Sequence, residues 1–314
     1  MNKCRWMILA ILVLLVVACG SDTPPTFTIR PEVFATATPF APTHSAIPPL
    51  PTDTLWVPPT FTPTPPASAT ASAPTPTGTS VPALYRVAYV LSDDVLNIRS
   101  GAGVQNPKVG ELAPHAGDVR ITGGGRMVAP SLWVPISSAG GSGWVNSRFL
   151  TGQVSQQAFC QDTRVEAILD AIGQAIENKD GDILAGLIHP ARSLRLRHSW
   201  SGQEVNLTAE EAAGFFTASE SYDWDGGVRG PIRTVIVPLL EKDFVAASDS
   251  ACGELIGGGA GALRLPFEYQ TVSSHTRYRP APEGGPTSDW GSWVIGVEYW
   301  EGMPYLGFLV HYGG

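Results

Sequence analysis

The most reactive side chains of this sequence belong to four cysteines and six histidines. A cysteine can act as a nucleophile, bind a metal or pair with a second cysteine, and each use requires partners at a characteristic spacing. The sequence contains no H-E-x-x-H motif, no cysteine–histidine pattern with zinc-site spacing and no G-x-S-x-G nucleophile motif. We therefore predict no catalytic residue, no bound metal and no cofactor, which favours a protein without enzymatic activity.

Cys19 ends an N-terminal segment that has the features of a secretory signal. Lys3 and Arg5 precede an apolar run over residues 6–17, which is shorter than the roughly 20 residues that a membrane-spanning helix needs. The run closes with Val-Val-Ala-Cys at residues 16–19. This ending resembles the lipobox of bacterial lipoprotein signals.

The lipoprotein resemblance implies that residues 1–18 are removed as a signal peptide. It further implies a diacylglycerol on the Cys19 sulfur and usually an acyl chain, such as palmitate, on the new amino group. Two or more chains hold a protein stably at a bilayer. We therefore expect an exported protein anchored through Cys19 to the extracytoplasmic face of a bacterial membrane. An ordinary signal peptide or signal anchor followed by a coincidental cysteine is the alternative.

The next segment, residues 19–83, differs in composition from the rest of the chain. Of the 28 prolines, 16 lie before residue 83, and no charged residue occurs between Asp53 and Arg86. Proline removes backbone donors, and Ser, Thr and Ala bury little surface, so no core can offset the entropy of ordering this segment. After the lipidated cysteine, we predict a disordered Pro/Thr/Ser-rich linker. An O-glycosylated stalk and a ligand for a proline-reading domain are the alternatives.

Residues 84–151 contain several short alternating segments separated by glycine-rich turns, a pattern that predicts a small all-β barrel. The segment resembles the bacterial SH3-like domain in LNIRSGAG (residues 96–103), in VGEL and GDVRITG, and in the closing GWVNSRFL (residues 143–150). The family pattern has proline where Ala102 stands.

The SH3-like resemblance implies a non-catalytic targeting module that binds peptidoglycan or its peptides. The candidate contact residues are Asn97, Arg99, Trp144, Asn146 and Arg148. The alternative for three of them is structural, with Trp144 in the core, Asn97 closing a turn and Arg148 solvated.

A second domain is expected at residues 160–314, after a short linker at 152–159. Apolar residues at three- and four-residue spacing predict a helix over 162–177 with Asp162 as its N-cap, followed by short helices at 182–188 and 208–216. A strand at 194–198 and a closing hairpin of residues 293–300 and 305–312 complete an α+β domain with an antiparallel sheet. This order resembles the cone-shaped fold of nuclear-transport-factor-2-like proteins.

Two further expectations concern this domain. Cys160 and Cys252 are the only thiols that remain once Cys4 is cleaved away and Cys19 is lipidated, and in an exported domain they predict a disulfide. In the hairpin, alternation places Trp293 on one face and Trp300 on the other, so one face belongs to the core and the other can form an aromatic platform for a ligand.

Charge also divides the chain. The net charge is −8, but residues 84–151 carry six basic and four acidic residues, whereas residues 152–314 carry 11 basic and 21 acidic ones. An acidic chain lacks the basic footprint of a nucleic-acid-binding protein. Four carboxylates could supply an acid/base pair for glycan hydrolysis: Glu268, Asp289, Glu298 and Glu301.

The features together predict a membrane-anchored, non-enzymatic lipoprotein whose SH3-like module binds cell-wall peptidoglycan or peptide and positions a distal domain. A cell-wall hydrolase with its site in the second domain is one alternative. A structural stalk that presents a protein-binding domain is the other.

Overall fold

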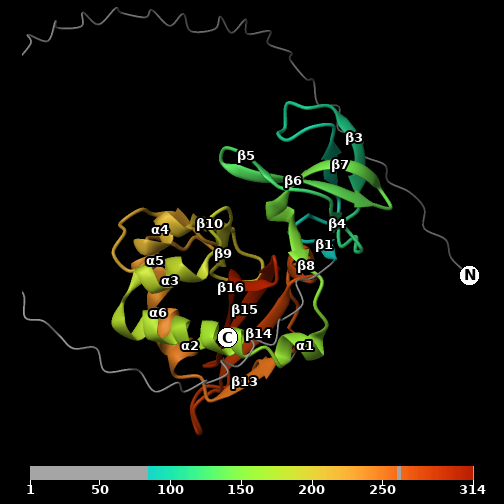
Figure 1. Ribbon diagram of the computed structural model, residues 1–314. Coiled ribbons are helices and arrows are strands. Elements are labelled where there is room, and N and C mark those ends of the chain that lie inside the picture. The colour runs from blue at the N-terminus through green and yellow to red at the C-terminus, as the bar shows by residue number, and fades with distance from the viewer. Residues whose placement is uncertain (1–83, 260–262, 314) are drawn as a thin grey trace, which may run out of the picture. The chain divides into compact units, whose positions relative to one another are not determined.

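The computed structural model describes residues 84–259 and 263–313. The predicted signal peptide, Cys19 and the proline-rich linker lie outside the described residues. The described residues belong to one compact unit of mixed helices and strands in which β-sheet predominates (Figure 1). Among these residues, no helix combines the length and the apolar character needed to cross a membrane.

Residues 84–152 form what we call the N-terminal β region. Its strands are β1 (Tyr85–Val87), β2 (Leu96–Arg99), β3 (Lys108–Leu112), β4 (Arg120–Ile121), β5 (Arg126–Val128), β6 (Ser131–Ser138), β7 (Gly141–Asn146) and β8 (Leu150–Gly152), and η1 (Ser147–Phe149) is a 3-10 turn. One sheet has the order β3-β2-β7-β6-β4, with β5 also on β6, while β1 pairs with β8. All of these pairings are antiparallel.

The core of the N-terminal β region is built from the inward side chains of these short strands, including Val87, Ile98 and Val145. Gly143 allows β7 to lie directly on β2, because a Cβ at this position would be 2.6 Å from the carbonyl oxygen of Arg99. One member of the same core, Trp300, comes from the other end of the chain. The core of this region is therefore completed by the C-terminal part of the protein.

Residues 153–313 form what we call the C-terminal region. Its helices are α1 (Gln156–Cys160), α2 (Thr163–Asn178), α3 (Gly181–Leu187), α4 (Ala209–Ala213), α5 (Ile232–Val235), α6 (Val237–Leu240) and the short turns η2 (Glu241–Val245) and η3 (Phe267–Tyr269). Its strands are β9 (Ser193–Arg197), β10 (Val205–Thr208), β11 (Tyr222–Asp223), β12 (Arg229–Gly230), β13 (Asp249–Cys252), β14 (Ser273–Arg279), β15 (Gly291–Trp300) and β16 (Met303–Gly313).

The main sheet of the C-terminal region has the order β10-β9-β16-β15-β14-β13. The predicted closing hairpin is present as β15 and β16. However, β16 pairs with β9 in parallel, so the prediction of a purely antiparallel sheet is wrong at this position. The reason is topological. The β9–β10 hairpin adds to the free edge of β16 through β9, and β9 runs in the same direction as β16.

The predicted long helix is present as α2. The Asp162 side chain accepts a hydrogen bond from the backbone N–H of Arg164 at 3.0 Å, which caps the helix. Its apolar stripe packs into the main core. The helix predicted at residues 208–216 is present as α4, and Thr208 and Glu211 form a capping box at its start, but it ends at Ala213 rather than near residue 216 because Gly214 is its C-cap.

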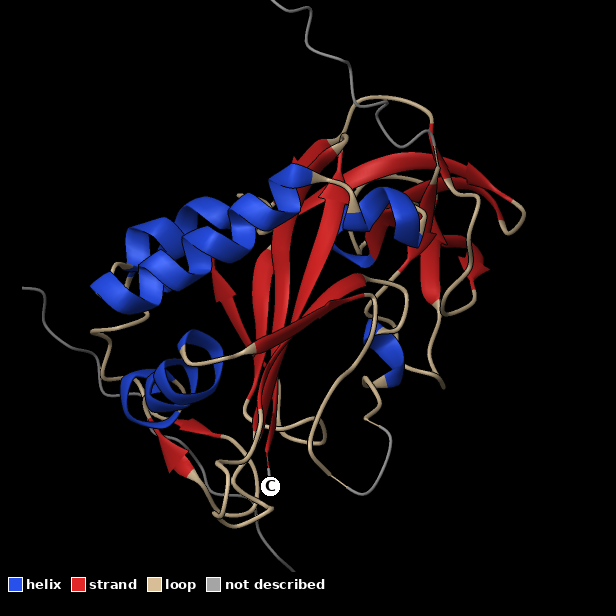
Figure 2. Cartoon of the chain, turned by 90° about the horizontal axis from the view of Figure 1, so that it is seen from below, coloured by secondary structure: helices blue, strands red, loops and turns tan. Residues whose placement is uncertain are grey.

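Both faces of the main sheet are buried along its central strand β15. Every residue of β15 is buried, and most of the helices lie along one face of the sheet (Figure 2). On that face Trp293 belongs to the helix-covered core, while Trp300 on the opposite face packs into the core of the N-terminal β region. β15 therefore presents no aromatic platform to a ligand, because helices cover one of its faces, while the N-terminal β region and residues such as Leu255 and Tyr269 cover the other.

Candidate functional site

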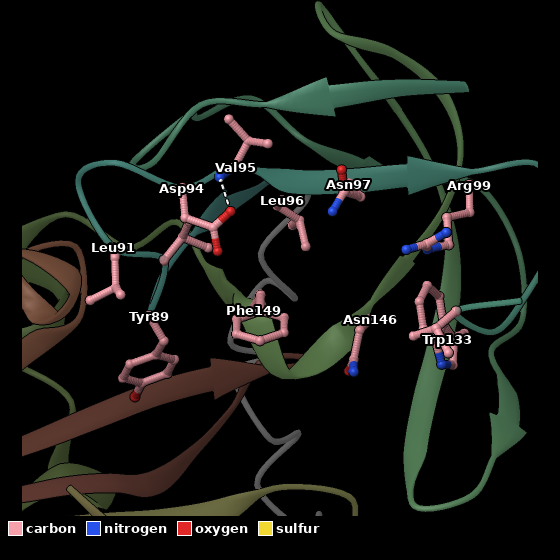
Figure 3. A pocket seen from close by; sticks show the side chains of 12 residues that line it. Tyr89, Leu91, Asp94, Val95, Leu96, Asn97, Arg99, Trp133, Asn146 and Phe149 are labelled. Atoms are coloured by element: carbon pink, nitrogen blue, oxygen red, sulfur yellow. Dashed lines mark hydrogen bonds between the residues drawn. The ribbon is translucent and has the colours of Figure 1, made fainter. Parts of the chain in front are cut away.

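The candidate site is a groove on the N-terminal β region. It has a volume of about 320 Å³, within the range of roughly 300–1,000 Å³ that is common for ligand sites. The groove follows β2 and lies between the loop before this strand and the beginning of η1 (Figure 3). Its lining residues are Tyr89, Val90, Leu91, Asp94, Val95, Leu96, Asn97, Arg99, Val104, Trp133, Asn146 and Phe149.

Two amide side chains line the middle of the groove. Asn97 lies on β2, and Asn146 lies at the end of β7. The Asn146 Oδ1 atom accepts a hydrogen bond from the Arg148 backbone N–H at 3.1 Å and so caps η1. The two N–H groups of that amide remain available, and the Asn97 side chain has no hydrogen-bond partner among the described residues. Side-chain amides both donate and accept, so this pair can read the backbone of a peptide.

Groups of opposite charge line the two ends of the groove. Asp94 lies at one end and Arg99 at the other, with both asparagines between them (Figure 3). Each makes one hydrogen bond nearby: Asp94 accepts from the Val95 N–H at 2.7 Å, and Arg99 Nη1 donates to the Asn106 carbonyl at 2.8 Å. Neither forms an ion pair within the part of the chain that the structure describes. The groove therefore has a negatively charged group at one end and a positively charged group at the other.

Aromatic and aliphatic side chains supply the remaining walls. Trp133 on β6 is 5% exposed, whereas Phe149 in η1 is partly buried. At the rim, Leu91 is 53% exposed and Val104 is 71% exposed. Exposed aliphatic side chains beside unpaired polar groups are typical of a surface that a ligand covers.

The structure places three of the five predicted contact residues in the groove and two outside it. Trp144 on β7 is half-buried, opposite Arg99 on β2, and does not line the cavity. Arg148 lies over the Phe149 ring, with its guanidinium carbon 5.7 Å from the ring centroid. Burial lowers the pKa of Arg148, and the neighbouring Arg195 guanidinium lowers it further. The charged groups that affect the pKa of Arg148 therefore lie in the C-terminal region.

Several lining residues had no distinctive sequence signal. In the sequence, Asp94 is typical of a turn. Trp133 is typical of a core position in a strand, and Phe149 of a core position in the closing GWVNSRFL motif. Leu91 and Val104 lie in loops. The folded loops before and after β2 bring Leu91 and Val104, respectively, beside Asn97, so their grouping depends on contacts that no local pattern encodes.

Tyr89 connects the groove with the C-terminal region. Its φ is 62°, and β1 ends two residues before it, at Val87. The Tyr89 N–H donates to the Glu268 carbonyl at 2.7 Å. The Arg195 guanidinium carbon lies 4.0 Å from the centre of its ring. Burial strongly raises the pKa of the Tyr89 hydroxyl, and the negative charge of Glu298 raises it further. Left-handed backbone is unfavourable for a tyrosine, so the surrounding contacts must hold this conformation.

A set of largely buried ion pairs lies next to Tyr89. We call this set the seam, and it consists of Arg192–Glu298, Arg195–Glu204 and Arg197–Glu268. The N···O distances are 2.8, 2.7 and 2.6 Å, respectively. In the first pair the two side chains are only 2% and 3% exposed. Burial opposes ionisation of Glu204, but Arg195 and a hydrogen bond from the Tyr269 hydroxyl outweigh it and lower the pKa.

The seam also joins the two regions of the chain. Arg192 Nη2 donates to the Ser147 carbonyl at 2.8 Å, and its guanidinium carbon lies 4.6 Å from the centre of the Trp300 ring. Thr151 Oγ1 accepts from the Tyr299 N–H at 3.0 Å. These contacts hold the groove in a fixed position beside the main sheet.

The carboxylates considered for glycan hydrolysis have other partners. Glu268 and Glu298 belong to the seam, while Asp289 pairs with Lys242 at 2.8 Å and Arg279 at 3.0 Å. Glu301 lies exposed in the turn between β15 and β16. The structure thus distributes these four residues over three places.

The predicted disulfide is confirmed. Cys160 at the end of α1 is bonded to Cys252 on the edge strand β13, with the Cα atoms 5.8 Å apart. It closes a separation of 92 residues in sequence and fastens α1 to the main sheet.

Within residues 84–259 and 263–313, no three histidine, cysteine, aspartate or glutamate side chains are grouped so that they could hold a metal ion. Comparisons of the chain with protein-family models, with curated proteins and with solved structures find no match.

Proposed function

We propose that this chain is an exported, lipid-anchored protein without enzymatic activity, whose N-terminal β region is an SH3-like module that binds cell-wall peptidoglycan or its peptide. The observation that carries the proposal is the groove, which gathers Asn97, Arg99 and Asn146 with aromatic side chains in one cavity. In this proposal, Cys19 carries the acyl chains, and residues 19–83 separate the groove from the bilayer.

The chemistry of the groove suits a short extended peptide. A wall peptide is a polyamide with carboxylate and amino groups, and the groove offers amides between an arginine and an aspartate. An extended chain advances about 3.3 Å per residue, so the five steps from Asp94 to Arg99 correspond to roughly 15 Å, or four to five ligand residues. We expect a ligand carboxylate beside Arg99 and a ligand amine beside Asp94.

The seam supports the positioning part of the proposal. Because the hydrogen bond from Arg192 to Ser147 and the packing of Trp300 join the regions, a ligand held in the groove fixes the place of the C-terminal region as well. The linker then sets the distance from the bilayer, since a polyproline-like chain advances about 3.1 Å per residue.

Cosedimentation with purified sacculi tests this function. The mature chain with Cys19→Ser, which removes the acyl chains, is mixed with sacculi and centrifuged. We expect it to sediment with them and to be released by excess soluble wall peptide. Heat-denatured protein serves as the control, and sedimentation no greater than that of the control would refute the proposal.

A further inference from the structure

A second cavity lies elsewhere on the same unit. It has a volume of about 400 Å³ and lies between β1, α1 and the beginning of β14. It shares no lining residue with the groove. Its polar lining includes Arg86, Arg264, Gln156, Thr271, Ser273 and Ser274.

The charge of this cavity is opposite to that of its surroundings. The C-terminal region carries 11 basic and 21 acidic residues, yet two arginines and no carboxylate line the cavity. Six arginines of the C-terminal region form ion pairs: Arg164, Arg192, Arg195, Arg197, Arg229 and Arg279. Arg86 and Arg264 have no ion-pair partner within the described part of the chain. Their positive charge is thus unneutralised at a concave surface.

Arg86 carries the strongest indication of a missing partner. Its Nε atom is buried and has no hydrogen-bond partner among the described residues. An unpaired buried donor is unfavourable, and more so when it belongs to a charged group. The side chain of Arg86 also lines the cavity, so an acidic group bound there would lie beside a guanidinium charge that has no ion-pair partner among the described residues.

The other walls indicate what accompanies the acidic group. Leu255 and Leu265 are half-buried and line the same cavity with Val154 and Val272. Ser273 and Ser274 add hydroxyl groups at the start of β14. The volume exceeds what a bare carboxylate or phosphate needs and falls within the usual range for small organic ligands.

We propose that this cavity binds a small organic anion, with its carboxylate or phosphate on Arg86 and Arg264 and a short apolar body against Leu255 and Leu265. Arg86 belongs to the N-terminal β region and the other contacts to the C-terminal region, so the ligand joins both. This site is independent of the proposed wall binding.

Titration calorimetry on the mature chain with Cys19→Ser tests the site, with hexanoate and hexyl phosphate as probes. The two probes distinguish a carboxylate from a phosphate head group. Acetate lacks the apolar body, and 1-hexanol lacks the charge. We expect saturable binding of at least one hexyl anion, with acetate and hexanol at least about tenfold weaker.

The variants Arg86→Gln and Arg264→Gln should each weaken binding of that anion by about tenfold or more, because each removes a charge-assisted hydrogen bond. Arg120→Gln, an exposed arginine on β4, is the matched control and should bind like the unsubstituted chain. Arg264 is itself exposed, so its variant tests the site even if Arg86→Gln fails to fold. Equal binding by all three variants, no binding of either hexyl anion, or equal binding of hexanol would overturn the proposal.

Discussion

The groove and the seam use the same residue types in opposite ways. Both contain arginine, carboxylate and aromatic side chains, and Tyr89 contacts both. In the seam each arginine lies within 2.8 Å of a carboxylate oxygen and is largely buried. In the groove, Asp94 and Arg99 lie at opposite ends and face open space. Charges neutralised inside the protein stabilise the C-terminal region, whereas charges left unpaired on a concave surface are available to a ligand.

This contrast predicts that changes to the C-terminal region and its seam reduce stability, while changes to the groove reduce binding. The four predictions below test it, in order of decreasing effect.

The largest expected effect is the loss of the disulfide. The double variant Cys160→Ser/Cys252→Ser releases a loop of 92 residues, which in the chain-entropy model lowers the free energy of unfolding by about 4–5 kcal/mol. Urea denaturation of the two proteins measures the difference. Equal stability, with the bond shown by mass spectrometry to be present in the parent, would contradict the model for this loop.

The next effect comes from the most buried ion pair. Glu298→Gln leaves Arg192 charged and without its partner in a site where both side chains are at most 3% exposed, and we expect a loss of about 3–5 kcal/mol. The matched variant Arg192→Met/Glu298→Met removes both charges and should recover most of that loss. A double variant as unstable as the single one would show that the pair itself, rather than the isolated charge, determines stability.

A smaller effect is expected at the groove. Arg99→Gln should weaken binding of a wall peptide with a free carboxylate by about tenfold, while stability changes by less than about 0.5 kcal/mol, since the guanidinium is half-buried and has no ion-pair partner among the described residues. Fluorescence titration with the peptide and its carboxamide measures this. If amidation weakens binding to the variant as much as to the parent, Arg99 does not contact the carboxylate.

Taken over a single pH unit, the smallest effect is a dependence of stability on pH at His189, beside Trp300 and Tyr305. Burial, followed by the charge of Arg192, lowers the pKa of His189 from 6.5 to about 4. Between these values the unfolded chain binds a proton that the folded chain does not. The free energy of unfolding therefore falls as pH drops from 6.5 toward 4, by at most about 1.4 kcal/mol per pH unit.

Carboxylates with lowered pKa values, such as Asp162 and Asp243, add their own loss at low pH. The His189→Gln variant isolates the histidine, since it should reduce the slope between pH 6.5 and 5 in urea denaturation. An unchanged slope would show that His189 does not titrate in this way.

Local features of this fold could be predicted from the sequence, and the joining of its two regions could not. The spacing of apolar residues locates α2, and Asp162 marks its cap, because both signals are local. The expectation that the chain is exported leaves two thiols, Cys160 and Cys252, and so predicts the disulfide by elimination. Trp300 looks like a platform residue, since nothing in its own strand indicates that the N-terminal β region covers it.

The same distinction applies to the groove. Asn97, Arg99 and Asn146 lie in segments with a recognisable pattern, so they could be named in advance. Asp94, Leu91 and Tyr89 enter the groove only through the folded loop before β2 and the unusual φ of Tyr89, which depend on contacts with η3 far along the chain.

The most direct test of the central claim compares sacculus binding by two variants of the mature chain with Cys19→Ser. Arg99→Gln alters the groove alone, and Arg192→Met/Glu298→Met alters the seam alone. We predict that the groove variant binds sacculi about tenfold more weakly, while the folded seam variant stays within about twofold of the parent. Parent-like binding by Arg99→Gln, or an equal loss in both variants, would contradict the assignment of wall binding to the groove.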